Sequence, residues 1–338
     1  AWAANAMDSW YGKAWRERQS YGPTLHAGTT QGASALPKLL ELARNQTAPA
    51  IIRATAATLA QPHANPGTLQ AAREMLQDPD PSVRIAALGM VAPMDTVNRV
   101  LSASPLLSDP VRGVRIEAAN TLADVPESQI PESRRAARAA ALQEYENSLA
   151  LEADWPSGSV NLGNLRLRQG RGDEAVAAFE RAIRLDPNFA GAYVNLSDAL
   201  RQLGREVEGE KALRRGLAVM PRNADLHHSL GLLLIRKGDK PGAYKELAEA
   251  ARLAPDNVRY TYVHAIALNA EGKRAEALAA LRGADQRNPN NLEVLSALIS
   301  INREAGDRQA ALRYARQAAV LLPDNANLAR LVTELEGK

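Results

Sequence analysis

Small and apolar residues recur at helical spacing along most of this chain, and the pattern repeats with two different periods. From about residue 156 onward the period is 34 residues. It is marked by Pro187, Pro221, Pro255, Pro289 and Pro323, and by Gly170, Gly204, Gly238, Gly272 and Gly306. Proline cannot continue a helix and glycine suits a left-handed helix end. Each proline is therefore expected to close a helix pair, and each glycine to lie in the turn inside a pair.

These 34-residue units resemble tetratricopeptide repeats (TPRs), in which two antiparallel helices cross at small residues. The first unit reads PSGSVNLGNLRLRQGRGDEAVAAFERAIRLDPNF. The family's signature positions hold Leu162, Gly163, Ala175, Phe179, Ala182 and Pro187. The fourth and fifth units are looser, with His264 and Asn302 in place of the usual Leu and Tyr. The resemblance implies five TPR units over residues 156–325 and a solubilising helix over 326–338.

The N-terminal third has a period of 31 residues, which is set by Arg53, Arg84 and Arg115. Apolar residues at matching offsets mark one face of a helix after each arginine. The pattern Asp-Pro…Val-Arg…Ala resembles HEAT-like repeats and implies three units over residues 32–125, the first of them degenerate. In such repeats the arginine is expected to pair with an aspartate of the neighbouring unit, here Asp78 or Asp109, rather than to bind anions.

Two segments lie outside both periods. In residues 126–155 two prolines predict a linker, and the helix after it has the spacing of half a TPR unit. We expect this helix to dock the two arrays as one continuous solenoid. Residues 1–31 predict a helix rich in tryptophan (Trp2, Trp10, Trp15) followed by a Gly/Thr-rich loop. That helix either caps the first repeat or meets a further surface on its N-terminal side. The predicted fold is all-α, a right-handed α-solenoid of helical hairpins.

The composition excludes several kinds of site and partner. The 338 residues include no cysteine, so this chain forms no disulfide, thiolate metal site or covalent c-type haem attachment of its own. Basic and acidic residues number 41 and 38 and are interspersed, which favours a solvated helical surface over a nucleic-acid face. No stretch approaches the roughly 18 apolar residues of a membrane span. The N-terminal stretch lacks the apolar core of a signal peptide. Because it begins with Ala, we expect a processed protein or a fragment.

The whole order of segments resembles the C-terminal half of bacterial multihaem cytochrome c proteins with TPR repeats. The matching residues are Trp10, Tyr11, Gly12, Ala14, Trp15 and Arg16, then LLSDPVRGVRIEAA at 106–119 and the segment Asp225–His228. The resemblance implies a periplasmic or extracellular setting, with c-type haem in a missing upstream module or in another chain. The alternative compartment is the cytoplasm.

Motifs for catalysis are missing from the sequence. It contains no GxSxG, P-loop or HExxH, and its five histidines follow no metal-binding spacing. His227 and His264 fall on core positions of the repeat, whereas His228 falls on the groove side. We therefore expect a chain that is not an enzyme and holds no cofactor or metal of its own.

The concave face of the TPR array is the candidate site, because the first helix of each unit lines it in this family. The residues placed there are Asn161, Asn164, Arg168, Asn195, Asp198, Arg201, His228, Arg236, Tyr262 and Asn269. Asn161 and Asn195 occupy equivalent positions, where stacked amides can hold a peptide backbone. Recognition of a C-terminal carboxylate would need Lys or Arg where Asp225 and Ser229 stand. The alternative is that this face is only solvated.

The function expected from these features is a non-catalytic scaffold that binds a protein or peptide in the TPR groove. By resemblance its partner is a multihaem cytochrome module, in cis or in trans. One alternative is an electron-transfer component with a non-covalent haem or metal held by His228 or His26. Another is a bilin-lyase-like protein of the HEAT type, which rests on fold analogy alone.

Overall fold

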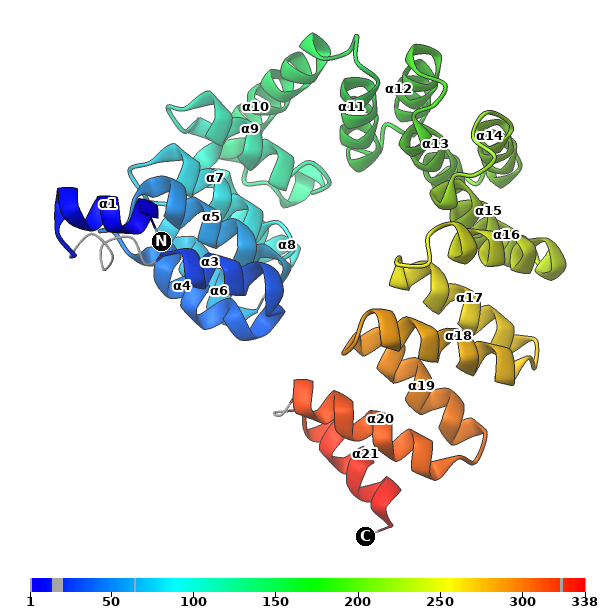
Figure 1. Ribbon diagram of the computed structural model, residues 1–338. Coiled ribbons are helices and arrows are strands. Elements are labelled where there is room, and N and C mark those ends of the chain that lie inside the picture. The colour runs from blue at the N-terminus through cyan, green and yellow to red at the C-terminus, as the bar shows by residue number, and fades with distance from the viewer. Residues whose placement is uncertain (1, 14–20, 64, 323–324, 338) are drawn as a thin grey trace. The chain divides into compact units, whose positions relative to one another are not determined.

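The computed structural model describes residues 2–13, 21–63, 65–322 and 325–337 (Figure 1). Within these ranges the chain is helix and turn, with no β-strand. Its contacts divide it into two compact units. The first unit contains residues 1–153 and 164–171, and the second contains residues 154–163 and 172–338. The fold is therefore the all-α solenoid that the sequence predicts.

The first unit contains three helix pairs that follow the 31-residue period. The pairs are α4 (Leu36–Arg44) with α5 (Ala50–Ala60), α6 (Pro66–Met75) with α7 (Pro81–Val91), and α8 (Thr96–Ala103) with α9 (Arg112–Thr121). Short 3₁₀ helices accompany them: η1 (Gly32–Ala35), η2 (Gln61–His63) and η3 (Ser104–Ser108). The second helices α5, α7 and α9 pack against one another in succession. Their buried faces carry many alanines, which lets the helices approach closely.

Arginine–aspartate pairs join consecutive repeats of this unit, as the sequence predicts. Arg53 binds Asp78, 25 residues later, and both side chains are buried. Arg84 repeats the contact with Asp109, with its Nε 2.9 Å from Oδ2. A guanidinium nitrogen of Arg84 also donates to the backbone carbonyl of Asp78 at 2.7 Å. Arg84 therefore links the segment that precedes its own helix α7 to the segment that precedes α9 in the next repeat.

The N-terminal segment differs from the prediction. A loop was expected over residues 26–32, but this is wrong, because α3 (Tyr21–Thr30) is a helix. Gly28 allows α3 to lie against the first repeat, since a Cβ there would be only 3.0 Å from Leu39 and 3.1 Å from Leu59. The contacts with α4 and α5 outweigh the low helix propensity of glycine and threonine.

Helix α1 (Trp2–Tyr11) carries two of the three tryptophans expected in the N-terminal helix. Trp2 is 81% exposed and Trp10 is 68% exposed. Trp15 lies outside the described residues. Since α1 makes no extensive contact with another described helix, it is α3, not α1, that covers the first repeat.

Helix α10 (Glu132–Leu151) follows the 3₁₀ helix η4 (Glu127–Gln129) and packs against α9 and η3. Arg115 of α9 donates to Glu144 of α10 at 2.8 Å, which continues the series of arginine–carboxylate pairs. The sequence assigned α10 to half a TPR unit, but the contacts group it with the first unit. The expected docking of the two arrays as one continuous solenoid remains a prediction.

The second unit contains the 34-residue repeats. The helix pairs are α11 (Pro156–Arg168) with α12 (Gly172–Leu185), α13 (Ala190–Gln202) with α14 (Glu206–Val219), α15 (Ala224–Lys237) with α16 (Lys240–Leu253), α17 (Val258–Ala270) with α18 (Arg274–Arg287), and α19 (Leu292–Glu304) with α20 (Arg308–Leu321). Helix α21 (Ala326–Glu336) follows the last pair and packs on α20. The C-terminal end of α11, from Asn164, groups with the first unit.

The glycines and prolines of the 34-residue period act as predicted. The five repeating glycines, Gly170 to Gly306, have φ between +73° and +81°, the left-handed conformation that ends a helix. The prolines at Pro187, Pro221, Pro255 and Pro289 each lie two residues beyond the end of a second helix. Pro323 lies outside the described residues.

The two helices of a repeat cross at small residues, as the resemblance implies. A Cβ on Gly163 would lie 2.5 Å from the ring of Phe179, and a Cβ on Gly231 would lie 2.7 Å from Leu247. These distances are too short for any side chain, so glycine is required for the observed approach. Ala175, at the next signature position, is fully buried.

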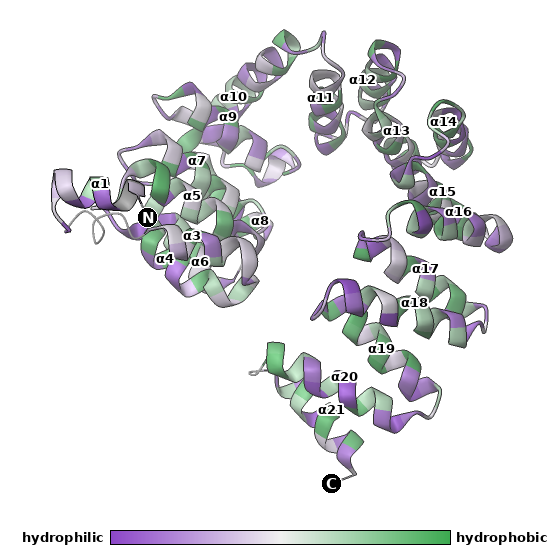
Figure 2. Cartoon of the chain, in the orientation of Figure 1, coloured by the Kyte–Doolittle hydropathy of each residue, from purple (hydrophilic) through white to green (hydrophobic). Residues whose placement is uncertain are grey.

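Hydrophobic and hydrophilic residues alternate around the helices in Figure 2, which is typical of helices that bury one face and expose the other. Accordingly, none of the described helices has both the length and the apolar character needed to span a bilayer.

Candidate peptide-binding groove

The first helices of the 34-residue repeats form the inner side of the second unit. Helix α13 contacts α15, and α17 contacts α19, in addition to their contacts with the second helices. No contact of similar extent joins one second helix to the next among the described residues. Helices that lie closer together lie on the inside of a curved array. The first helices therefore line its concave face.

Residues 34 apart on these helices lie at the same level of the groove. The three levels, read from α13 to α19, are Val194, His228, Tyr262 and Ser296; Asp198, Leu232, Ile266 and Ser300; and Arg201, Ile235, Asn269 and Arg303. The middle two helices, α15 and α17, thus contribute an apolar centre. Ile235 and Ile266 are each 40% exposed there. Polar and charged side chains from α13 and α19 flank this centre on both sides.

Asn161 and Asn195 lie on the first helices α11 and α13, at the position next to the first level. Asn161 is exposed and Asn195 is half-buried. The equivalent residues of the next repeats are Ser229, Val263 and Ala297, which lack an amide. The amides that the sequence predicts as a backbone clamp therefore occur only on α11 and α13 among these helices. They do not continue onto α15 and α17, which carry the apolar centre.

Several predicted groove residues already have partners within the chain. Arg201 lies 3.6 Å from Asp198 on the same helix. Arg236 lies 3.2 Å from Glu206 of α14. Such exposed pairs contribute little to stability, so a ligand can replace the intramolecular partner at small cost.

Asn269 and Tyr262 both belong to α17. The Nδ2 of Asn269 donates to Glu304 at 3.3 Å, which identifies its Oδ1 as the remaining acceptor. Tyr262 is half-buried, and the guanidinium of Arg259 lies 5.8 Å from its ring centroid. These two residues place an amide and an aromatic ring on either side of Ile266.

His228 stacks on Tyr260, with ring centroids 4.5 Å apart. The hydroxyl of Tyr260 donates to Asp225, and burial together with this hydrogen bond raises the pKa of Tyr260. Burial, and next the nearby Arg259, lower the pKa of His228, so its ring is neutral at pH 7. Asp225 puts a carboxylate where a carboxylate clamp would need a cation. This part of the groove is unsuited to a C-terminal carboxylate.

The adjacent His227 has a structural role. Its Nδ1 lies 2.5 Å from Glu246 of α16, and its Nε2 lies 3.0 Å from the carbonyl of Pro221. Both ring nitrogens are therefore engaged, as expected for a core position. In the part of the chain that the structure describes, no group of His, Asp or Glu side chains is arranged to hold a metal ion.

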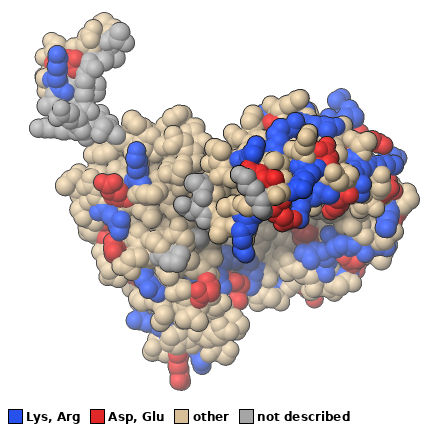
Figure 3. All heavy atoms as spheres, turned by 90° about the horizontal axis from the view of Figure 1, so that it is seen from below, with Lys and Arg blue, Asp and Glu red and all other residues tan. Residues whose placement is uncertain are grey.

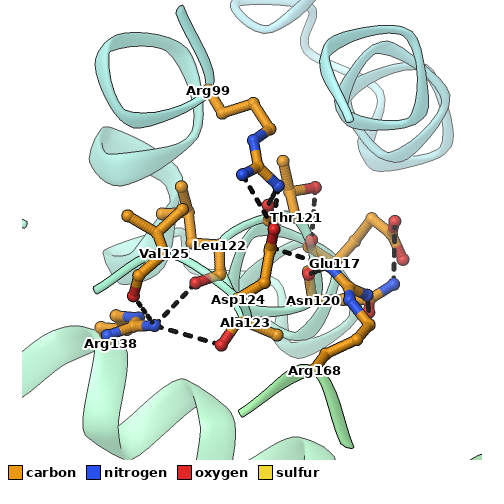
Figure 4. Close-up of polar contacts among 10 residues, drawn as sticks. All are labelled: Arg99, Glu117, Asn120, Thr121, Leu122, Ala123, Asp124, Val125, Arg138 and Arg168. Carbon is orange, nitrogen blue, oxygen red and sulfur yellow. Dashed lines mark hydrogen bonds and ion pairs between the residues drawn. The ribbon is translucent and has the colours of Figure 1, made fainter. Parts of the chain in front are cut away.

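Arg168, which was predicted to line the groove, has its partners in the first unit. Its guanidinium donates to the side chain of Asn120 at 2.6 Å and to the carbonyl of Asn120 at 2.5 Å, within the first unit (Figure 4). Asp124 lies 3.4 Å away and also binds Arg99 at 2.8 Å. Asn164, on the same helix, also groups with the first unit. Arg168 thus binds acceptors at the C-terminal end of α9, and its place in the groove remains a prediction.

The polar cluster around Asp124 was not foreseen from the sequence. Arg138 of α10 donates to the carbonyls of Leu122 and Val125, both at 2.7 Å, and so satisfies acceptors beyond the end of α9. Arg99 and Asp124 are 25 residues apart, the same separation as Arg53 and Asp78, and that spacing was the available signal. A polar cavity of about 610 Å³ lies beside this cluster.

Charges of both signs are mixed on the face drawn in Figure 3, where Lys and Arg lie among Asp and Glu. This is the solvated surface that the sequence predicts. It favours recognition by local side-chain chemistry over attraction to a polyanion.

Comparisons with known proteins bear on the second unit. A family model described as "Tetratricopeptide repeat" matches residues 160–218 and 228–291. These segments are therefore tetratricopeptide repeats. No curated protein matches the chain.

Solved structures that resemble the chain align with about half of it. A MamA protein is 17% identical over 51% of this chain and 94% of its own, with a TM-score of 0.43. YrrB, described as a TPR protein with an unusual peptide-binding site, is 19% identical over 57% of this chain and 97% of its own, with a TM-score of 0.42. PilF of Pseudomonas aeruginosa is 22% identical over 54% of this chain and 83% of its own, with a TM-score of 0.45.

Proposed function

We propose that this chain is a protein–protein interaction scaffold whose concave TPR face binds an extended segment of a partner protein. The observation that carries the proposal is the apolar centre formed by Leu232, Ile235 and Ile266 in an otherwise polar inner face. Exposed isoleucines on a preformed helical surface favour burial against a partner. Because the helices are already folded, binding needs little ordering of the scaffold.

The groove also suggests what kind of segment binds. An extended peptide offers backbone N–H and C=O groups to Asn161 and Asn195, and aliphatic side chains to the apolar centre. A free C-terminal carboxylate is disfavoured by Asp225. The proposed ligand is therefore an internal segment with aliphatic residues.

A library of random 12-residue peptides displayed on phage tests this proposal. The Kd of each peptide recovered on the full chain is measured by fluorescence anisotropy for the wild type, for N161A/N195A and for Ile266→Lys. We expect N161A/N195A to weaken binding about tenfold, and Ile266→Lys to abolish it. Lys211→Ala on the second helix α14 is the control and should change nothing. Recovered peptides whose Kd is the same for all four proteins would refute the groove assignment.

We also propose that the first unit consists of HEAT-like repeats and that the chain associates with a multihaem cytochrome. The Arg53–Asp78 and Arg84–Asp109 pairs support HEAT-like repeats in the first unit. The WYGKAWR segment and the exposed Trp2 and Trp10 support a further partner surface near the N-terminus, by resemblance a c-type haem module in an extracytoplasmic setting. Purified multihaem cytochrome added to the chain tests this by co-sedimentation. A chain lacking residues 1–13 should lose the interaction, and equal binding by both forms would contradict it.

A further inference from the structure

The second helices of the first unit enclose a groove that is separate from the TPR face. It has a volume of about 410 Å³ and is lined by residues of α5, α7 and α9. Its floor is made of small side chains, among them Ala54, Thr55 and Ala86.

The walls of this groove are apolar. Ile51 is 67% exposed and Ile85 is 36% exposed. The hydroxyl of Thr55 donates to the carbonyl of Ile51 at 2.7 Å, so it is satisfied within its own helix. The amide of Gln61 donates to the carbonyl of Ala86 at 3.3 Å. The groove therefore offers a partner mainly hydrophobic contact.

Among the described residues that line the groove, Glu117 of α9 is the one with a charged side chain. Its carboxylate is half-buried, and Asn120 donates to it across a long 3.4 Å. Arg168 lies nearby, but its guanidinium is committed to Asn120 and Asp124 (Figure 4). The repeats at equivalent positions have Thr55 and Ala86, so this charge occurs at one end only.

The environment of Glu117 is unfavourable for its charged form. Burial raises the pKa of Glu117 above its usual value, although Asn120 and Arg168 act in the opposite direction. A carboxyl group whose pKa is raised on folding reduces stability at pH values above its unfolded pKa. At neutral pH the free protein is therefore less stable with this carboxylate than with a neutral side chain of the same shape. A cation from a partner would offset that cost.

We propose that the α5–α7–α9 groove is a second docking site, for a peptide segment that combines aliphatic side chains with a lysine or arginine placed on Glu117. The aliphatic residues cover Ile51 and Ile85, and the cation completes the hydrogen bonding of the carboxylate. The single charge at one end fixes the direction of the bound segment. This site does not depend on the TPR face.

The same 12-residue phage library, panned on the full chain, tests the proposal. After panning, peptides that bind the wild type but not Ile85→Lys are sequenced. We expect each to contain Lys or Arg among aliphatic residues. Glu117→Gln should weaken their binding about tenfold or more, whereas Glu132→Gln, an exposed control on α10, should not. Replacing the peptide's basic residue by Gln should weaken its binding to the wild type. The same replacement should not change its affinity for the Glu117→Gln variant any further.

A stability measurement separates recognition from structure. Glu117→Gln should unfold at the same or a higher temperature than the wild type while it loses peptide affinity. A lower unfolding temperature would assign Glu117 a structural role and overturn the proposal. Recovery of no Ile85-dependent peptide, or of peptides without a basic residue, would also overturn it. These peptides should still bind the Ile266→Lys variant. The proposal for the α5–α7–α9 groove and the proposal for the TPR groove can therefore fail independently of each other.

Discussion

The two arrays join consecutive helix pairs by different means. In the first, an arginine and a carboxylate meet between repeats, and in the pair Arg53–Asp78 both side chains are buried. In the second, pairs between repeats such as Arg236–Glu206 are exposed to solvent. Within a repeat of the second array, the two helices cross at small residues, of which Gly163 beneath Phe179 is the clearest.

A helical repeat can therefore be specified by charge or by shape. A buried charge pair contributes little net stability, but removing one partner leaves an uncompensated charge and is costly. An exposed pair is worth about 0–1 kcal/mol. The first array is therefore expected to be sensitive to changes of charge, and the second to changes of volume.

The largest effect is expected for Asp78→Asn, which neutralises one partner of the buried pair at constant shape. It should destabilise the first array by about 3–5 kcal/mol, because Arg53 stays buried without a counter-charge. Hydrogen exchange followed by mass spectrometry should show faster exchange in α5 and α7, with the second array unchanged. The double variant Arg53→Met/Asp78→Leu should recover most of the protection. Equal destabilisation of both arrays would show that they do not differ in their dependence on buried charge.

The same pair predicts acid sensitivity. Burial opposes ionisation of Asp78, but hydrogen bonds from Arg53, from the backbone of Asp80 and from Gln46 together lower its pKa below 3.8. A lowered acid pKa contributes stability that is present above the unfolded pKa and lost as pH falls through the folded pKa. The first array should therefore lose protection below about pH 4. In Asp78→Asn this step should be absent.

A smaller effect is expected for Gly163→Ala in the second array. The new Cβ would lie 2.5 Å from the ring of Phe179, and such overpacking costs about 1–3 kcal/mol. Gly191→Ala is the matched control, since the nearest atom to its Cβ, on Phe189, lies 3.9 Å away. The control should be neutral or stabilising, because alanine favours a helix more than glycine does. Urea unfolding of both variants is followed by far-UV circular dichroism. Equal midpoints for the two would show that close packing at Gly163 does not determine the stability of the second array.

The smallest effect is expected for Glu206→Gln, which makes the same carboxylate-to-amide change as Asp78→Asn in an exposed pair. It should cost less than about 0.5 kcal/mol, and 0.5 M salt should abolish the difference. A cost as large as that of Asp78→Asn would show that the second array also depends on charge.

The repeats of both arrays could be predicted because glycine, proline and arginine act locally at fixed spacing. The left-handed Gly170 and the pairing of Arg84 with Asp109 follow from backbone conformation and from the repeat itself. Helix α3 could not be predicted, because its glycines and threonines become helical only through contacts with α4 and α5.

The contacts of the candidate site residues are harder to predict from the sequence. Arg168 occupies a groove position in the repeat frame, but its partner Asn120 lies 48 residues away in another array, a contact that repeat spacing does not encode. Glu117 was not singled out, because a single glutamate on a helix face has no distinctive pattern. Its burial emerges only when α9 packs in the first unit.

Hydrogen exchange of the full chain with and without a library-selected peptide tests the proposed binding face most directly. We expect added protection in the first helices α13, α15, α17 and α19 for peptides whose binding Ile266→Lys abolishes. Protection confined to the second helices α14, α16 and α18 would contradict it.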